Sequence, residues 1–229
     1  MTALRRVPWR GIALGALILL AAPFAFYAFR FGLEGAGFGA LRETYLIQPA
    51  APFGNGAISL HMILGGALTV LVPLQLSPGL RRRFPHWHRG AGRLLVAGAL
   101  LTGAAGCAFI LMRGTIGGMW MDAGFLLYGA LMMLAAAQAW RFARAGRFVP
   151  HRAWALRLFV LVLGSWLYRV HYGLWYLATD GLASNPEFTG TFDSVQNFAF
   201  YLPYLVLLEI WLRTRPVPPE LRTTACEKG

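Results

Sequence analysis

Residues 92–112 have the sequence GRLLVAGALLTGAAGCAFILM, in which Arg93 is the only charged side chain. At a rise of about 1.5 Å per residue, a helix of this length crosses the roughly 30 Å of hydrocarbon in a bilayer. The run therefore predicts a membrane-spanning helix. Five similar runs predict five further spans, at 11–31, 57–76, 123–141, 153–177 and 196–213.

The composition of the whole chain supports this interpretation. Of its 229 residues, 57% are hydrophobic and 13% are charged, whereas soluble domains carry about 25% charged residues. No linker or low-complexity tract divides the chain, so we expect a single transmembrane domain over residues 1–229. The predicted fold class is all-α: a polytopic bundle of six spans, with a four-helix core of spans 2–5 and flanking spans 1 and 6. No span shows the Gly/Pro interruption that is typical of secondary transporters.

The 21 basic and 9 acidic residues are distributed unevenly along the chain. Basic residues gather before the first span, in the connections 77–91 and 142–152, and in the tail, whereas the alternate connections carry few basic residues. The positive-inside rule then predicts a multi-pass protein of the bacterial inner membrane with both termini in the cytoplasm. The excess of positive charge is explained by its role in orienting the chain in the membrane and by contact with anionic lipids. Nucleic acid is not an expected partner, because the basic residues lie between apolar runs.

Two histidines are predicted at one depth near the outer face. His61 lies about four residues into a span that enters from outside, and His171 lies eighteen residues along a span that starts inside. Two such histidines are what a b-type haem needs as axial ligands, and Gly65 and Gly164 would make room for its ring. The alternative is a pair of interfacial or hydrogen-bonded histidines without a cofactor. Arg169, two residues from His171, is predicted either to snorkel outward or to meet a haem propionate, a quinone carbonyl or a lipid phosphate.

Copper is a minor alternative cofactor for the outer face. The outer connection holds Met119, Met121 and Asp122, with Met112 just before it and Met62 next to His61. Thioether and imidazole ligands favour Cu(I). Methionine is also an ordinary apolar residue, so the same pattern is typical of span ends without a metal.

The inner face carries a short internal repeat. Residues 83–89, RFPHWHR, and residues 147–152, RFVPHR, each precede an apolar span that enters in the same direction. This pattern predicts a parallel repeat of two helical hairpins, with His88 and His151 facing each other. These histidines could serve a second haem or a quinone. The cationic side chains beside them, which could instead bind lipid phosphates, are Arg89, Arg93, Arg152 and Arg157.

The same residues carry a resemblance to a known family. The pattern His88-Arg89-x-x-Gly92-Arg93, followed by His151-Arg152-x-Trp154-x-x-Arg157 and then Arg169, resembles a family of predicted bacterial integral-membrane proteins classed as a domain of unknown function. The resemblance runs from about His61 to His171. It implies a membrane location and the positions of the motifs, and it supplies no reaction.

We therefore expect an electron-transfer or quinone-linked redox protein that holds b-type haem between its helices and works with a redox partner protein. The alternative is a non-catalytic subunit or assembly factor of a larger complex, whose arginines and histidines bind lipid. Glu209 lies about one turn from the inner end of span 6, at the depth of Arg157, which predicts a structural ion pair between them.

Overall fold

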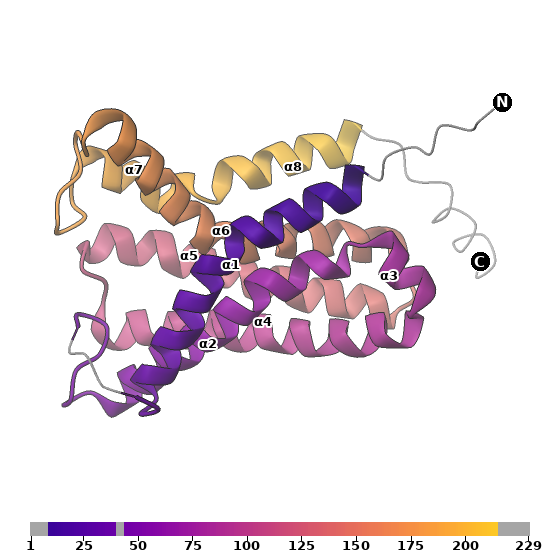
Figure 1. The fold of residues 1–229 in the computed structure, drawn as a ribbon, viewed down its shortest axis with the longest axis horizontal. Coiled ribbons are helices and arrows are strands. Elements are labelled where there is room, and N and C mark those ends of the chain that lie inside the picture. The colour runs from indigo at the N-terminus through magenta and orange to yellow at the C-terminus, as the bar shows by residue number, and fades with distance from the viewer. Residues whose placement is uncertain (1–8, 40–43, 215–229) are drawn as a thin grey trace.

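A computed structural model describes residues 9–39 and 44–214 as a helical bundle (Figure 1). The basic residues before the first span and those of the tail, which contribute to the predicted orientation, lie outside the described residues. The described part contains no strand, which confirms the all-α fold class. Its helices are α1 (Trp9–Gly35), α2 (Pro52–Gln75), α3 (Pro78–Arg83), α4 (Pro85–Arg113), α5 (Gly118–Arg144), α6 (Phe148–Thr179), α7 (Thr191–Ala199) and α8 (Leu202–Thr214).

Six helical segments of the described chain are long and apolar enough to cross a membrane. They are α1, α2, α4, α5, α6 and the consecutive pair α7–α8. A helix satisfies its backbone hydrogen bonds internally, which a segment in lipid requires because no water is present. The prediction of six spans is confirmed. The short helix α3 lies between the second and third spans, and the hydroxyl of Ser77 caps it by accepting a hydrogen bond from Leu80 N at 3.4 Å.

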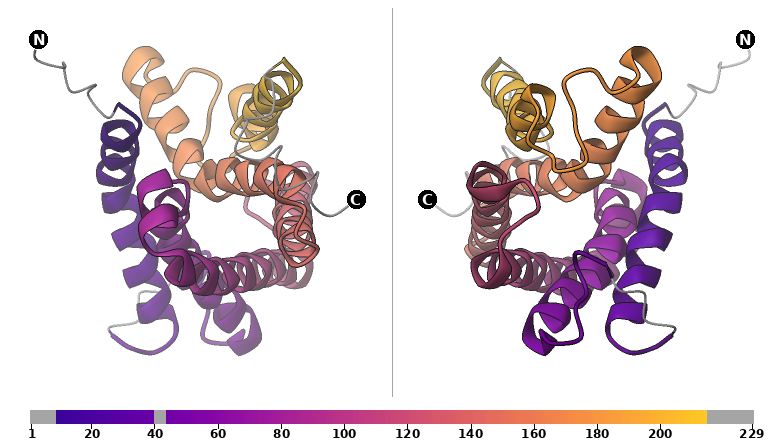
Figure 2. Two further views of the ribbon diagram at one scale, coloured as in Figure 1. Left: turned by 90° about the vertical axis from the view of Figure 1, so that its right-hand side faces the viewer. Right: turned by 90° about the vertical axis from the view of Figure 1, so that its left-hand side faces the viewer.

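Four of the spans form a ring. Helix α2 packs against α4, α4 against α5, α5 against α6, and α6 again against α2. The end-on views in Figure 2 show these four helices around a common axis. Helix α1 packs on α2, while α7 contacts α5 and α8 contacts α6. This arrangement confirms the predicted four-helix core with flanking first and last spans.

The connections alternate between the two ends of the bundle. Those between α2 and α4 and between α5 and α6 lie at the right-hand end in Figure 1, which we call the His88 end. Those after α1, α4 and α6 lie at the opposite end, which we call the His61 end. Among the described connections, the basic clusters Arg81–Arg83 and Arg144–Arg147 lie together at the His88 end, as the charge pattern predicts.

The sixth span differs from the expectation of uninterrupted helices. Helix α7 ends at Ala199 and α8 begins at Leu202, with Phe200 and Tyr201 between them fully buried. Pro203 has no N–H, so it cannot continue the hydrogen-bond ladder of α7. The expectation was wrong here because a hydropathy run does not reveal which residues turn inward. The Tyr201 hydroxyl donates to Gly124 O at 3.1 Å, which anchors the break to α5.

Candidate functional site

A cavity of about 400 Å³ lies inside the four-helix ring, toward the His61 end. We call it the central cavity. On α2 its wall runs from Ile58 to Thr69, a length of about 17 Å at 1.5 Å per residue. Helix α1 adds Phe24 and Ala28 to one side. Its volume falls within the roughly 300–1,000 Å³ that is typical of small-molecule sites.

Glycines make part of this space. A Cβ atom on Gly65 would meet only the Thr102 methyl group, at 3.7 Å. A Cβ on Gly106 would lie 2.7 Å from His61 Nδ1, so the absence of a side chain there lets the imidazole lie against α4. Gly164, which was expected to make room for a haem ring, instead faces the ring of Tyr128 at 2.8 Å. That expectation was wrong because a neighbouring aromatic side chain fills the space.

His61 lines the central cavity in a defined orientation. Its Nδ1 lies 2.9 Å from Thr102 O. A carbonyl oxygen only accepts hydrogen bonds, so Nδ1 carries the proton, and in the neutral ring Nε2 keeps its lone pair. No described residue forms a hydrogen bond with Nε2. The ring therefore offers an acceptor to a molecule in the cavity.

Arg169 lines the same cavity from α6. Its Nη1 donates to Ser165 O at 2.9 Å, and its guanidinium carbon lies 4.6 Å from the centre of the Phe24 ring. Because Ser165 is one turn earlier on the helix, the side chain turns back along α6 instead of extending to the His61 end. Within residues 9–39 and 44–214, no carboxylate pairs with this guanidinium. The cavity wall thus carries a cation that no acidic side chain of the described chain neutralises.

Hydroxyl groups complete the polar part of the wall. The Thr102 hydroxyl is buried and has no hydrogen-bond partner among the described residues. The Tyr128 hydroxyl donates to Leu161 O at 2.5 Å, and the Tyr168 hydroxyl donates to that of Tyr172 at 3.3 Å. These residues carry no motif that marks them in the sequence. A search for hydroxyl side chains within apolar spans, at the depth of a histidine, would have identified them.

Two loop segments cover the cavity at the His61 end. Arg113 donates from Nη1 to Leu46 O at 2.9 Å and from Nη2 to Tyr45 O at 2.8 Å. Asp122 accepts from Thr115 N at 2.6 Å. Burial raises the pKa of the Tyr45 phenol above its ordinary value, Asp122 raises it further, and Arg113 partly offsets this. Leu46 and Thr115 line the cavity, so these contacts hold its cover in place.

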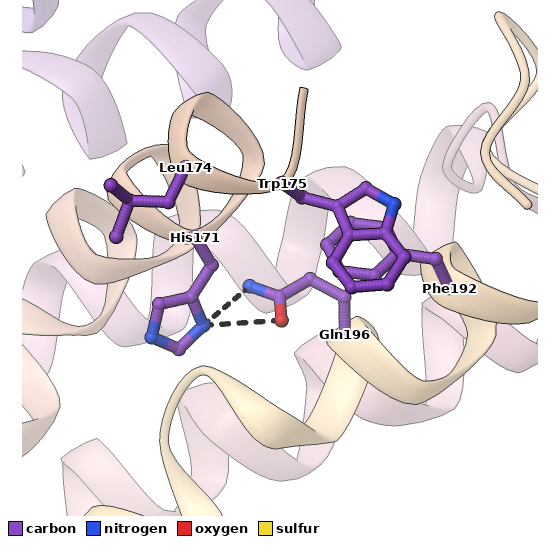
Figure 3. Close-up of a pocket in the computed structure, with 5 residues that line it drawn as sticks. All are labelled: His171, Leu174, Trp175, Phe192 and Gln196. Carbon is purple, nitrogen blue, oxygen red and sulfur yellow. Dashed lines mark hydrogen bonds between the residues drawn. The ribbon is translucent and has the colours of Figure 1, made fainter. Parts of the chain in front are cut away.

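His171 lies elsewhere. It lines a separate pocket of about 330 Å³ between α6 and α7, with Leu174, Trp175, Phe192 and Gln196 (Figure 3). Its Nδ1 lies 3.1 Å from Gln196 Oε1 and 2.9 Å from Nε2 of the same amide. Its Nε2 lies 2.6 Å from the Tyr204 hydroxyl. Both ring nitrogens therefore have protein partners.

The structure does not bring His61 and His171 together, and their two pockets share no lining residue. Successive helical residues point about 100° apart, so the side chain two positions after Arg169 faces away from the cavity that Arg169 lines. The residues present therefore do not fit a haem held by both histidines in this arrangement.

At the His88 end, His151 Nδ1 lies 2.8 Å from Ala139 O. His88 lies in the first turn of α4, and its Nδ1 is buried with no hydrogen-bond partner in the described chain. His151 lies in the first turn of α6, which starts at the same end of the bundle as α4. The buried Gln75 Oε1 likewise has no described partner. The two histidines thus share one end of the bundle, and their facing each other stays a prediction.

The arginines near these histidines differ in their contacts. Arg89 and Arg93 are exposed on α4, and Arg89 Nη2 lies 3.1 Å from His86 Nδ1. The Arg152 guanidinium lies 5.5 Å from the Trp211 ring of α8. These positions suit contact with lipid head groups.

The predicted ion pair between Arg157 and Glu209 is confirmed. Arg157 Nε donates to Oε1 at 2.5 Å and Nη2 donates to Oε2 at 2.9 Å. The guanidinium also lies 4.5 Å from the Trp154 ring. This two-point contact joins α6 to α8, so it orients the last helix against the core.

The methionines considered as copper ligands do not gather at one place. Met112 and Met119 are exposed, whereas Met62 and Met121 are buried in the cavity wall with His61. In the described ranges, no group of three His, Cys, Asp or Glu residues could hold a metal ion.

Comparison with known families gives one match. The model of a family described as predicted membrane protein (DUF2306) matches residues 58–212, more than half of the chain. No curated protein matches significantly. No solved structure does so either. The matched range contains α4, α5, α6, most of α2 and both histidine pairs.

Proposed function

For this chain, which belongs to the DUF2306 family of predicted membrane proteins, we propose a function as a quinone-linked redox protein that binds a quinone head group in the central cavity. One observation carries the proposal: His61 and Arg169, which no carboxylate of the described residues neutralises, both line an otherwise largely apolar cavity. They lie on α2 and α6, two helices that pack against each other in the ring.

The chemistry of a quinone matches these groups. A quinone joins an apolar ring to two carbonyl oxygens, and when bound it supplies two-electron, two-proton redox chemistry. Arg169 would donate a hydrogen bond to one oxygen. His61 Nε2, which carries no proton, would accept a hydrogen bond from the hydroxyl of the reduced form and hold its proton. The apolar wall and the cover formed by Leu46 and Thr115 would exclude water.

The orientation in the membrane is part of the proposal. The basic connections at the His88 end favour that end in the cytoplasm of a bacterial cell, with both termini on the same side. The His61 end and its cavity then lie toward the outer face of the inner membrane.

Haem is a second candidate, supported by the contact between His61 and Thr102. Metal-bound histidines commonly donate their other ring N–H to a backbone carbonyl, as His61 Nδ1 does here. His61 would bind the iron through Nε2, and Arg169 would pair with a propionate. A haem would supply one-electron transfer at this site. A second cofactor at the other end would use His88 and His151.

The test is equilibrium binding of short-chain benzoquinones and naphthoquinones to the purified protein in detergent. We expect His61→Ala and Arg169→Gln each to weaken binding about 10–100-fold, because each removes a hydrogen bond worth roughly 1.5–3 kcal/mol. His86→Ala, an exposed histidine outside the cavity, is the control and should bind as the wild type does.

Oxidised and dithionite-reduced absorption spectra of the same samples separate the candidates. A Soret band that His61→Ala removes favours haem. If the protein binds no quinone and shows no Soret band, the redox function is wrong, and a non-catalytic subunit that binds lipid through its arginines becomes the better account.

A further inference from the structure

We propose that Tyr168, Tyr172 and Asp193 form a proton relay from the central cavity to the aqueous surface at the His61 end. The proposal rests on the proposed function, because it gives the proton of a bound quinol a route out. It concerns residues that neither the histidine pairs nor the arginine motifs include.

The inner half of the relay is a row of hydroxyl groups on α6. Tyr168 lines the cavity, and its hydroxyl donates to that of Tyr172 at 3.3 Å. The two residues are one turn apart, so both hydroxyls lie on one face of the helix. The Tyr172 hydroxyl donates in turn to Asp193 Oδ1 at 2.7 Å. A hydrogen-bonded chain therefore leads from the cavity wall to a carboxylate.

Asp193 is an unusual end point for such a chain. It is fully buried near the start of α7. Its other contacts are neutral: Oδ1 accepts from Ser184 Oγ at 2.7 Å, and Oδ2 accepts from Asn185 N at 3.1 Å and Gly190 N at 3.0 Å. In the described part of the chain, no cation pairs with it. Two of its four donors are hydroxyl groups, so the carboxylate joins the Tyr172 hydroxyl to that of Ser184.

The outer half of the relay reaches the surface through the loop after α6. Ser184 Oγ, which contacts Asp193, also accepts a hydrogen bond from the Tyr176 hydroxyl at 3.4 Å. Tyr176 is 48% exposed and lies in the last turn of α6, so the proposal places its hydroxyl at the aqueous surface. Every step from Tyr168 to Tyr176 is thus a contact between oxygen atoms within hydrogen-bond distance.

The proposed reaction is oxidation of a bound quinol by a one-electron acceptor, coupled to proton transfer along the relay. A quinol has two hydroxyl groups: one donates to His61, and the relay takes the proton of the other. When that second O–H bond breaks beside Tyr168, its electron leaves to the acceptor, and its proton passes to Tyr168 while the Tyr168 proton moves to Tyr172.

The Tyr172 proton moves to Asp193, which later releases it through Ser184 to water. Release requires the Ser184 and Tyr176 hydroxyls to turn outward, because both O–H bonds point toward Asp193 in the structure. Each hydroxyl ends with one proton, and its O–H bond rotates back to the starting direction before the next transfer.

Asp193 also holds the loop from Ser184 to Gly190, so the test must separate a relay from a structural role. Tyr172→Phe removes one oxygen atom, keeps the aromatic ring, and leaves the three other hydrogen bonds of Asp193 intact. Tyr204→Phe removes a hydroxyl that contacts His171, outside the relay, and is the matched control.

The experiment follows oxidation of bound short-chain quinol by ferricyanide, with a pH dye reporting proton release, in H2O and D2O. For Tyr172→Phe we expect quinol binding within twofold of the wild type, oxidation and proton release about a hundredfold slower, and a larger solvent isotope effect. Tyr204→Phe should match the wild type. Wild-type oxidation and proton release by folded Tyr172→Phe would overturn the relay.

A second measurement keeps the relay testable if no quinol binds. In the ligand-free protein, infrared spectroscopy follows exchange of the Tyr168 hydroxyl in D2O, with its band assigned by Tyr168→Phe. We expect exchange at least tenfold slower in Tyr172→Phe and unchanged in Tyr204→Phe. Equal exchange rates in all three proteins would show that the relay does not connect Tyr168 to water.

Discussion

His61 and His171 lie in the same half of the bundle, yet their surroundings differ in kind. His61 has one ring nitrogen bonded to Thr102 O and the other without a described partner, beside a cavity of about 400 Å³. His171 has both nitrogens bonded, to Gln196 and Tyr204. One imidazole is therefore free to bind a molecule, whereas the other is a structural link between α6 and the last span.

The largest expected effect comes from filling the central cavity. In Gly65→Leu the new Cβ would meet only the Thr102 methyl group, at 3.7 Å, so the helix can keep its packing while the side chain extends into the space. We expect quinone binding to weaken more than about 100-fold, as equilibrium titration would measure, because the displaced ligand loses its whole apolar contact.

Gly173→Leu is the matched control for this variant. Gly173 lies on α6 near His171, and a Cβ there would meet no atom within 4 Å. Binding should stay unchanged in it. If Gly65→Leu binds quinone as the wild type does while both variants remain folded, the central cavity is not the binding site.

For His171→Ala we expect a smaller effect, on stability and not on quinone binding. This change leaves the Gln196 amide and the Tyr204 hydroxyl without their partner, which should lower the free energy of unfolding by about 1–3 kcal/mol. Quinone binding should change less than twofold. Thermal unfolding in detergent and the binding titration together test this. A loss of binding with unchanged stability would instead assign His171 to the ligand site.

The features that depend on helix length, hydropathy and depth in the membrane could be predicted from the sequence. Six spans, a four-helix core, and the ion pair between Arg157 and Glu209 all follow from counting residues along helices, and the structure confirms each. Depth is predictable because the rise per residue is constant.

The face of each helix was harder to predict. In lipid, side chains toward the membrane and toward the core are both apolar, so hydropathy does not mark the inward face. Arg169 and His171 show this, since they are only two positions apart on α6, yet Arg169 lines the central cavity and His171 lines a separate pocket. The interruption at Phe200 and Tyr201 and the buried Asp193 depend on tertiary contacts of the same kind.

The central claim is that a quinone head group lies between His61 and Arg169, and photolabelling tests it most directly. An azido-quinone is irradiated on the purified protein, with and without excess unlabelled quinone, and the labelled residues are identified by mass spectrometry. The account predicts competed labels on cavity residues of α2, α4 and α5, such as Met62, Cys107 and Met132. Competed labels confined to Trp175 and Phe192 beside His171, or none at all, would contradict it.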